Sequence, residues 1–261
     1  TLQGNCPTII ISRSFVRPVT IDAAKARVNG LVLTGVNIRW RGGTLSAPGG
    51  MDAKGPAGYA VLIRGARNIQ FERAVVTGAK KGMVIDRSSS VTVDRVEFTR
   101  LREDGIIASQ TAGLIVTSSS FADFLPRPSR CTSPAGVVAT AVARRDCTGT
   151  WIDGNHADAV QLRDGVTDAR IAENTVRGPT QGITQMDTRG DAPLARVVIE
   201  NNRIETSAYH QITLTECADC SIRRNIVRRE RGWDKRAVIR PGKARRCGND
   251  SQDEARDQPC R

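Results

Sequence analysis

Short apolar runs recur along this chain at a nearly constant spacing. Six runs that open with an apolar residue lie at positions 60–64, 83–87, 106–110, 159–163, 183–187 and 212–216. Their starts are 23, 23, 53, 24 and 29 residues apart. The wide interval fits two repeats plus an insertion, or one repeat with a long loop. Such self-similarity is the sequence signature of a solenoid, whose single repeats cannot bury their apolar faces alone.

A second apolar run follows each first run and leads into a bend. Three residues beyond the last apolar position of the later runs stand Asn174, Asn202 and Asn225. Asparagine tolerates left-handed backbone, and its amide can bond to the asparagine of the next repeat. The abundance of Val, Ile, Thr and Gly favours short strands over helices. We therefore expect coils of about three strands that stack about 4.8 Å apart.

These features resemble the right-handed parallel β-helix of the pectate-lyase-like superfamily. The resemblance covers roughly residues 19–240, and its first rungs are matched by the segments 17–23, 30–33 and 41–44. It implies an all-β fold, a solenoid of about 7–9 rungs of ~23 residues each. The superfamily includes polysaccharide lyases, glycosidases, uronan epimerases, phage tailspikes and non-enzymatic adhesins, so the fold alone does not choose a function.

The whole chain is expected to be one domain. Within residues 1–261 we predict three departures from the regular coil: an N-terminal edge at 1–18, a loop insertion at 122–154 and a C-terminal cap or tail at 241–261. A cap is needed because the end of a solenoid otherwise exposes an unpaired strand edge.

The charge of the chain points to an anionic partner. Lys and Arg number 39 against 27 Asp and Glu, a formal net charge of +12. Nucleic acid is the weaker candidate, because aromatic residues make up only 4% and the basic residues are spread over every rung. No segment approaches the ~20 apolar residues of a membrane span. We therefore predict an acidic polysaccharide or oligosaccharide as the partner, with the oligomeric state left open.

Seven cysteines favour an oxidising compartment. No signal peptide is visible and the chain starts at Thr1, which is consistent with a removed leader, so we expect a secreted or periplasmic bacterial protein. For Cys217 and Cys220 the sequence leaves three alternatives open: a disulfide bridge, a redox pair or half of a metal site. Cys6 is then the cysteine without a partner. The preferred local disulfides are Cys131–Cys147 and Cys247–Cys260.

Both histidines of the chain precede aligned strands. His156 and His210 fall on nearly the same turn, two rungs or about 10 Å apart. Strand alternation is predicted to point Gln161 and Gln185 outward as a stacked pair on adjacent rungs. The long insertion enters just before His156, so we expect it to form a cleft wall, because solenoid insertions often gather on the binding face. The segment 154–161 also resembles a motif of β-helix proteins associated with uronate polysaccharides.

The chemistry that fits best is β-elimination on an acidic polysaccharide. This reaction needs a base for the C5 proton, an acid for the leaving oxygen and a neutralised carboxylate. We predict His156 or His210 as the base and Tyr209 or Lys235 as the acid. The predicted substrate-binding residues are Asp158, Gln161, Arg163, Gln181, Gln185, Arg236 and Arg240.

Asp158 has a second possible role. It is expected to orient His156 or to contribute to a Ca²⁺ site. No metal ligands are assigned, no cofactor is certain, and Ca²⁺ remains possible. The sequence has no aspartate cluster like the calcium site of pectate lyases.

Three other functions remain open. A uronan C5-epimerase would use the same constellation. A glycoside hydrolase is less favoured, because no carboxylate trio like that of polygalacturonases is present, although five carboxylates keep it open: Asp86, Asp104, Asp158, Asp187 and Glu216. In a non-catalytic glycan-binding β-helix, the turn at Asn155 and Asp158 would be structural.

Overall fold

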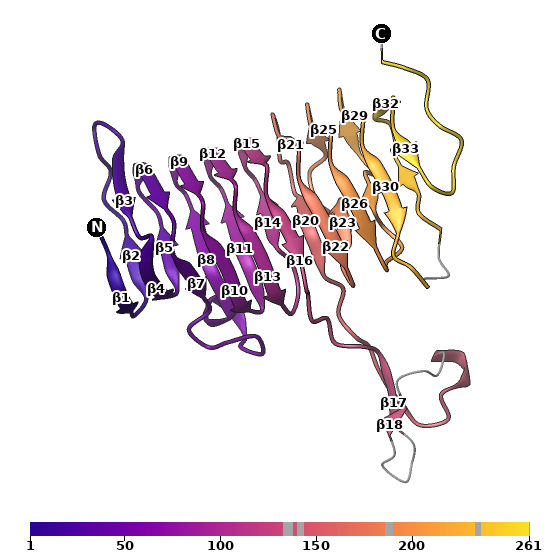
Figure 1. The fold of residues 1–261 in the computed structure, drawn as a ribbon, viewed down its shortest axis with the longest axis horizontal. Coiled ribbons are helices and arrows are strands. Elements are labelled where there is room, and N and C mark those ends of the chain that lie inside the picture. Colours follow the sequence, from indigo (N-terminus) through magenta and orange to yellow (C-terminus); the bar gives the residue numbers. More distant parts are fainter. Residues whose placement is uncertain (133–137, 140–143, 186–189, 233–235, 261) are drawn as a thin grey trace.

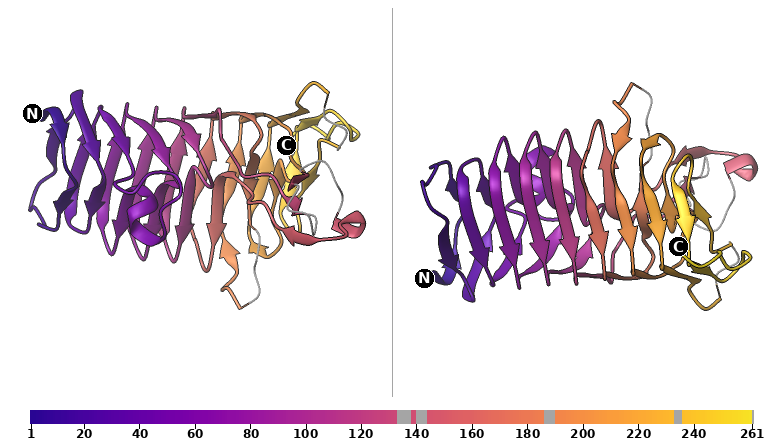
Figure 2. Two further views of the ribbon diagram at one scale, coloured as in Figure 1. Left: turned by 90° about the horizontal axis from the view of Figure 1, so that it is seen from below. Right: turned by 90° about the horizontal axis from the view of Figure 1, so that it is seen from above.

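The chain folds as a right-handed parallel β-helix, which confirms the predicted fold class (Figure 1). The computed structural model describes residues 1–132, 138–139, 144–185, 190–232 and 236–260. This part of the chain contains no α-helix, only two short 3₁₀ turns, η1 (Gly55–Gly58) and η2 (Arg144–Asp146). The rungs stand side by side along the long axis, with the two termini at opposite ends (Figure 2).

The first sheet in chain order has ten parallel strands. They are β1 (Gln3–Cys6), β4 (Lys25–Asn29), β7 (Thr44–Ser46), β10 (Val75–Ala79), β13 (Glu97–Leu101), β16 (Ser120–Ala122), β22 (Thr175–Gly178), β26 (Arg203–Thr206), β30 (Ile226–Arg229) and β33 (Asp250–Ser251).

The second sheet has nine parallel strands and carries the candidate site described below. They are β2 (Ile9–Ile11), β5 (Leu31–Leu33), β8 (Tyr59–Arg64), β11 (Lys81–Asp86), β14 (Ile106–Ser109), β20 (Asp158–Arg163), β23 (Gln181–Thr184), β27 (Ile212–Thr213) and β31 (Ile239–Arg240).

The third sheet also has nine strands, so the rung count lies at the upper end of the prediction. They are β3 (Val19–Asp22), β6 (Val36–Arg41), β9 (Arg67–Glu72), β12 (Ser89–Asp94), β15 (Ala112–Thr117), β21 (Arg170–Ala172), β25 (Val198–Glu200), β29 (Ser221–Arg223) and β32 (Arg245–Cys247). The β-helix extends beyond the expected residues 19–240, because β1 and β2 at its start and β32 and β33 at its end belong to the three sheets.

An arm at residues 123–157 projects from the solenoid between β16 and β20 (Figure 1). It carries three short antiparallel strands, β17 (Arg130–Thr132), β18 (Val138–Ala139) and β19 (Thr150–Ile152), and the disulfide Cys131–Cys147. A smaller parallel pair, β24 (Leu194–Ala195) and β28 (Cys217–Ala218), lies beside the third sheet. The arm corresponds to the insertion predicted at 122–154.

The register of the second sheet corrects the sequence alignment at two strands. Met83 pairs with Val61 rather than Ala60, and Ile106 pairs with Val160 rather than Ala159. The alternation fails because two successive positions are buried in these rungs, and the first of the two is small at Ala60, Gly82 and Ala159. A side-chain carbon at Gly82 would lie 2.9 Å from both Phe98 and Leu101.

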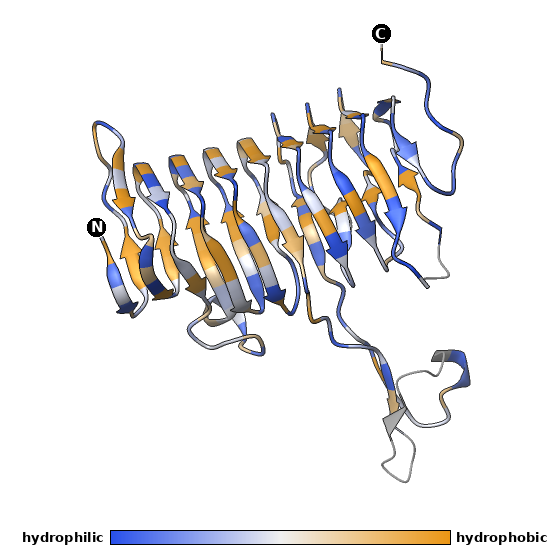
Figure 3. Ribbon diagram, in the orientation of Figure 1, coloured by the Kyte–Doolittle hydropathy of each residue, from blue (hydrophilic) through white to orange (hydrophobic). Residues whose placement is uncertain are grey.

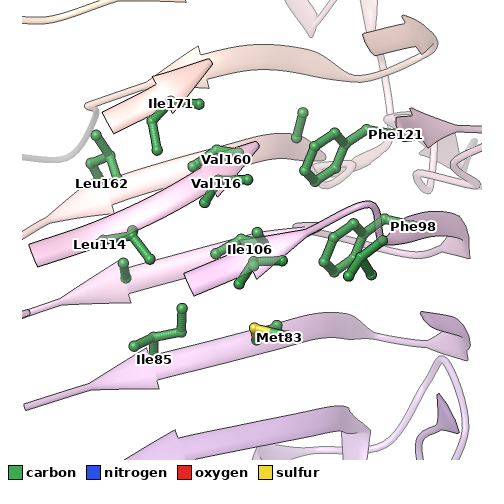
Figure 4. Close-up of a cluster of buried hydrophobic side chains, with 14 of the residues drawn as sticks. Met83, Ile85, Phe98, Ile106, Leu114, Val116, Phe121, Val160, Leu162 and Ile171 are labelled. Carbon is green, nitrogen blue, oxygen red and sulfur yellow. The ribbon is translucent and has the colours of Figure 1, made fainter. Parts of the chain in front are cut away.

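The interior is a continuous apolar stack. Hydrophobic segments recur along the strands of successive rungs (Figure 3), and their buried side chains form one core cluster. Met83, Ile106 and Val160 lie above one another on successive rungs (Figure 4). Phe98 and Phe121 stack with their ring centroids 4.7 Å apart. Burying these side chains supplies the main driving force for folding, because no rung has a core of its own.

A buried asparagine ladder closes the bend between the third and first sheets. Asn174, Asn202, Asn225 and Asn249 are at most 1% exposed. The Nδ2 of each of the first three donates to the Oδ1 of the next asparagine at 2.9–3.0 Å, and the Nδ2 of Asn249 donates to Asp257 in the tail at 2.6 Å. Each Nδ2 also donates to a backbone carbonyl of the preceding rung. The ladder confirms the predicted stacking and extends it by one rung, to Asn249.

The C-terminal tail covers the last edge of the second sheet. Carboxylate oxygens of Asp253 and Glu254 accept hydrogen bonds from the backbone N–H groups of Ala237 and Ile239, at 2.7 and 2.9 Å. The disulfide Cys247–Cys260 attaches the tail to the coil. Side-chain acceptors thus replace the strand that the edge lacks.

All three expected cysteine pairs are bonded. Besides the bridges in the arm and the tail, Cys217 is bonded to Cys220, which selects the bridge among the three possibilities considered for this pair. Cys6 has a free thiol, as expected for the left-over cysteine.

Replacing Asn202 with alanine should lower the free energy of unfolding by about 2–4 kcal/mol. The change removes the acceptor for the backbone N–H and side-chain amide of Asn174 and leaves the carbonyl of Ile171 without its donor. Urea unfolding followed by circular dichroism measures the loss. Asn29→Ala, at an exposed asparagine with a single long side-chain contact of 3.4 Å, is the matched control and should cost well under half as much.

Candidate functional site

Two columns of polar side chains run across the outer face of the second sheet. The first column contains Lys81, Asp104, Asp158, Gln181 and His210, and Asp158 pairs directly with Gln181. The main-chain bonds from Gly105 to Asp158 and from Gly182 to His210 place Asp104 and His210 in the same column.

The second column lies three residues further along the strands. It contains Gln161, Thr184, Thr213 and Arg240 on four successive strands. Together the two columns form a polar band, which we call the site band.

A recessed acidic pair occupies the middle of the site band. Asp104 and Asp158 are 5% and 3% exposed, and the backbone N–H of Asp158 donates to Asp104 Oδ1 at 3.3 Å. The Lys81 ammonium donates to Asp104 Oδ2 at 2.8 Å, and the Thr184 hydroxyl donates to Asp158 Oδ1 at 2.8 Å. The pair is therefore held by bonds to the strands on both sides of it.

Burial, and after it the negative charge of Asp104, raise the pKa of Asp158 to about 7. The pKa of Lys81 is raised from its ordinary value, since the attraction of Asp104 and Glu103 outweighs the burial that opposes it. Near neutral pH the cluster therefore keeps Lys81 cationic beside Asp104 and favours the protonated form of Asp158.

His210 lies at the other end of the site band, against Arg240. Its Nδ1 is 3.4 Å from Arg240 Nη1 and 3.1 Å from the hydroxyl oxygen of Thr213. A guanidinium can only donate, so Nδ1 accepts and the neutral ring carries its proton on Nε2. Partial burial, the charge of Arg240 and the charge of His156 lower the pKa of His210, which favours the neutral ring at pH 7.

The predicted stack of Gln161 on Gln185 is wrong. Gln161 pairs with Thr184, so Gln185 is shifted by one residue and is 1% exposed. Its amide bonds to the backbone of Thr215 and Glu216, which fixes a bend. The error follows from the misaligned strand at position 159.

Gln181 and Gln161 lie in the two columns of the site band, and both side chains are buried. Gln181 is 5% exposed, and its Oε1 accepts no hydrogen bond from the described residues. A buried acceptor of this kind costs free energy unless a ligand or water satisfies it. It lies between Asp158 and His210 in the first column.

His156 lies at the base of the arm, where an open pocket of about 750 Å³ separates the arm from the solenoid. His156 and Pro179 form its floor, and Arg127 and Asp153 line the arm side. Asn155 fixes this geometry by hydrogen bonds to Arg102 and Arg127. The two histidines are two rungs apart as predicted, but they are offset along the strands, because His210 is in register with Asp158 rather than with His156.

The remaining predicted site residues lie at the margins of the band. Tyr209 is 51% exposed, with its ring centroid 6.4 Å from that of His210. Arg163 pairs with Asp191 at 3.2 Å, and Arg236 donates to the backbone of Asp253 in the tail. Lys235 lies outside the described residues.

Sequence reasoning missed Lys81, Thr184 and Thr213 as members of the site and gave Asp104 only a minor place. The signal was present in the repeat, because all four occupy columns that a correct register aligns. For a calcium ion the donor set does not fit, since the Lys81 ammonium already lies 2.8 Å from Asp104 Oδ2. No group of three or more candidate metal ligands gathers in the described ranges.

The chain is similar to known β-helix proteins. The family model described as "Right handed beta helix region" matches residues 29–196. Among the curated proteins, none matches. The structure is similar to the Dettilon tailspike protein, with a TM-score of 0.50 and 12% identity over 94% of this chain and 54% of that one.

Two enzymes are also among the similar structures. DFA-IIIase from Arthrobacter chlorophenolicus A6 without its lid has a TM-score of 0.48 and 12% identity, over 84% of this chain and 48% of that one. Alginate lyase from Paenibacillus sp. str. FPU-7 has a TM-score of 0.45 and 13% identity, over 94% of this chain and 99% of that one. The chain spans about half the length of the tailspike and of DFA-IIIase. At these identities the likeness shows the fold alone.

Asp158→Asn should change how stability depends on pH. The folded-state pKa of about 7 lies above the ordinary value of 3.8, so between these values the unfolded chain releases a proton that the folded chain retains. Wild-type stability therefore falls as pH rises from about 4 to about 7, by at most about 4 kcal/mol from this group. Asparagine removes that fall.

Urea unfolding at a series of pH values measures this effect. The free-energy difference between Asp158→Asn and wild type should shift in favour of the variant as pH rises through this window. Asp219→Asn, at an exposed position, should follow the wild-type curve. Parallel curves for all three proteins would show that Asp158 is ionised in the folded chain.

Proposed function

The chain belongs to the right-handed β-helix family, and we propose that it is a lyase that cleaves an acidic, uronate-containing polysaccharide by β-elimination on the site band. The observation that carries the proposal is the contact of His210 Nδ1 with Arg240 Nη1 at 3.4 Å. It places a neutral base and a permanent cation at one point on an open sheet face.

A uronate would use this pair directly. Its carboxylate is the natural partner of the Arg240 guanidinium, and by taking that guanidinium it frees the Nδ1 lone pair of His210. The C5 carbon is bonded to the carboxylate carbon, so binding at Arg240 brings the C5 proton close to Nδ1. Charge on the carboxylate is neutralised while the proton is removed, which is the condition for elimination.

The rest of the site band suits an extended sugar chain. Its strands are about 4.8 Å apart, so the band from Lys81 to Arg240 presents polar groups at a regular spacing along the axis of the solenoid. Gln181 offers a buried acceptor for a sugar hydroxyl. The net charge of +12 favours an anionic polymer, and the arm beside His156 forms one wall.

The three disulfides support a protein that works in an oxidising compartment, either secreted or periplasmic. Polymeric uronates are substrates that an enzyme meets outside the cytoplasm. The described residues hold no helix long and apolar enough to cross a membrane.

Incubation with alginate, pectate, glucuronan and glycosaminoglycans tests the proposal. A lyase creates an unsaturated uronyl end that absorbs in the ultraviolet, and we expect that absorbance with at least one polymer. New reducing ends without it would indicate a hydrolase, inverted C5 configuration without cleavage an epimerase, and binding alone a glycan-binding protein. Each of these three outcomes contradicts the lyase assignment.

Arg240→Ala and His210→Ala should each reduce kcat/KM about 100-fold or more, since each removes a group that acts on the reacting sugar. Arg245→Ala, an exposed arginine on the third sheet in the same rung, should leave activity unchanged. Full activity in both site variants would place the reaction elsewhere.

The acid limb of the pH–rate profile should have an apparent pKa below 6.5, the ordinary pKa of histidine, because the pKa of His210 is lowered. Activity should rise with pH through that limb as His210 loses its proton. A limb above 6.5 would exclude His210 as the base.

A further inference from the structure

The site band contains an acid that the sequence did not assign to catalysis. Asp158 lies in the same column as His210, with only Gln181 between them, and is fixed by the Thr184 hydroxyl on one side and Asp104 on the other. Nothing in the proposed binding of a uronate to Arg240 uses this carboxyl group.

Resting on the proposed function, we propose that Asp158 is the catalytic acid that protonates the leaving oxygen of the cleaved sugar bond, while Asp104 keeps the proton on Asp158. In this step the C5–H bond breaks and its proton passes to His210. The electron pair forms the C4=C5 double bond, and the C4–O bond breaks. The leaving oxygen takes its proton from Asp158, which is reprotonated from water.

The spacing of the two groups suits the geometry of elimination. A base and an acid on either side of the C5–C4–O segment stand about 8 Å apart, from two hydrogen-bond lengths and the span of two covalent bonds. Asp158 and His210 are two strand spacings apart, about 10 Å between their backbones.

The proton lies on Asp158 rather than on Asp104. Lys81 donates to Asp104 Oδ2 at 2.8 Å and also lies 3.7 Å from Glu103, so the ammonium is a direct counter-ion for a negative charge on Asp104. Among the described residues, the Asp158 carboxyl has no ion pair of its own: it accepts the Thr184 hydroxyl on Oδ1 and shares a side-chain hydrogen bond with Asp104. Two carboxylates this close cannot both ionise readily, so the partner without the lysine keeps the proton.

Burial of Asp158 then gives an acid that is active near neutral pH. Its pKa of about 7, raised by burial and by Asp104, is close to the pH at which a general acid is most effective. The titratable and charged groups around it are Asp104, Lys81 and Glu103 on one side and the histidines on the other. Tyr209, one of the two donors expected from sequence, is half exposed at the margin of the band.

A pair of substrates separates an acid from a residue that merely supports the fold. The first substrate is an oligomer of the uronan that the wild-type chain cleaves. The second is a 4-deoxy-4-fluoro uronide, whose leaving group, fluoride, needs no proton. The Asp158→Asn variant keeps the shape and hydrogen bonding of the side chain, and urea unfolding checks its stability.

We expect Asp158→Asn to lose about 100-fold or more in kcat on the oligomer and to release fluoride at close to the wild-type rate. We expect wild type to show an alkaline limb near pH 7 on the oligomer and no such limb on the fluoro substrate. Tyr209→Phe should retain activity on both substrates.

Three results would overturn the assignment. Full oligomer activity in Asp158→Asn would remove Asp158 from the mechanism, and equal losses on both substrates would show that it supports the fold or binding. Fluoride release retained by Tyr209→Phe together with lost oligomer activity would make Tyr209 the acid. A wild-type chain inactive on every uronan would instead refute the proposed lyase function, and this assignment with it.

Discussion

Parallel pairing between rungs is the constraint on which this structure depends. Each strand of a rung bonds to the rungs before and after it at the ordinary strand spacing, so one residue's place in its rung fixes its neighbours on every other rung. The inner face becomes one apolar stack, the bends become ladders and the outer face becomes columns. The asparagine ladder and the site band are therefore two results of the same register, one inside a bend and one on the outer face of the second sheet.

The fold could be predicted from the sequence because its evidence is repeated. A misalignment of one repeat does not change the prediction, because the other repeats still show the pattern. Asparagines at 174, 202 and 225 mark the same bend three times. The cysteine pairs were also predictable, because each lies within 16 residues of its partner and brackets a local loop or tail.

The site was less predictable, because it depends on single residues of register. Placing Ala159 where Val160 belongs moved Gln161 by one position and matched it with Gln185, which is buried and bonded to a bend. The physical cause is the pair of successive inward positions that begins at a small residue such as Gly82. Strand alternation alone does not predict such a pair. The pairing of Asp104 with Asp158 was not predicted for a further reason: the burial of Asp158 depends on the neighbouring rungs and the chain around them, not on its local sequence.

The position of Arg240 has a consequence for the dynamics of the chain. Its strand, β31, is the last of the second sheet, paired with β27 on one side and held on the other by the carboxylates of Asp253 and Glu254. Terminal strands of a solenoid open at a lower free-energy cost than interior ones, since they have one neighbouring rung instead of two. A polymer lying across β23, β27 and β31 would tie this end to the interior. Polymer binding and opening of the C-terminal rung would thus be thermodynamically linked. On binding, amide hydrogen exchange would slow first in that rung.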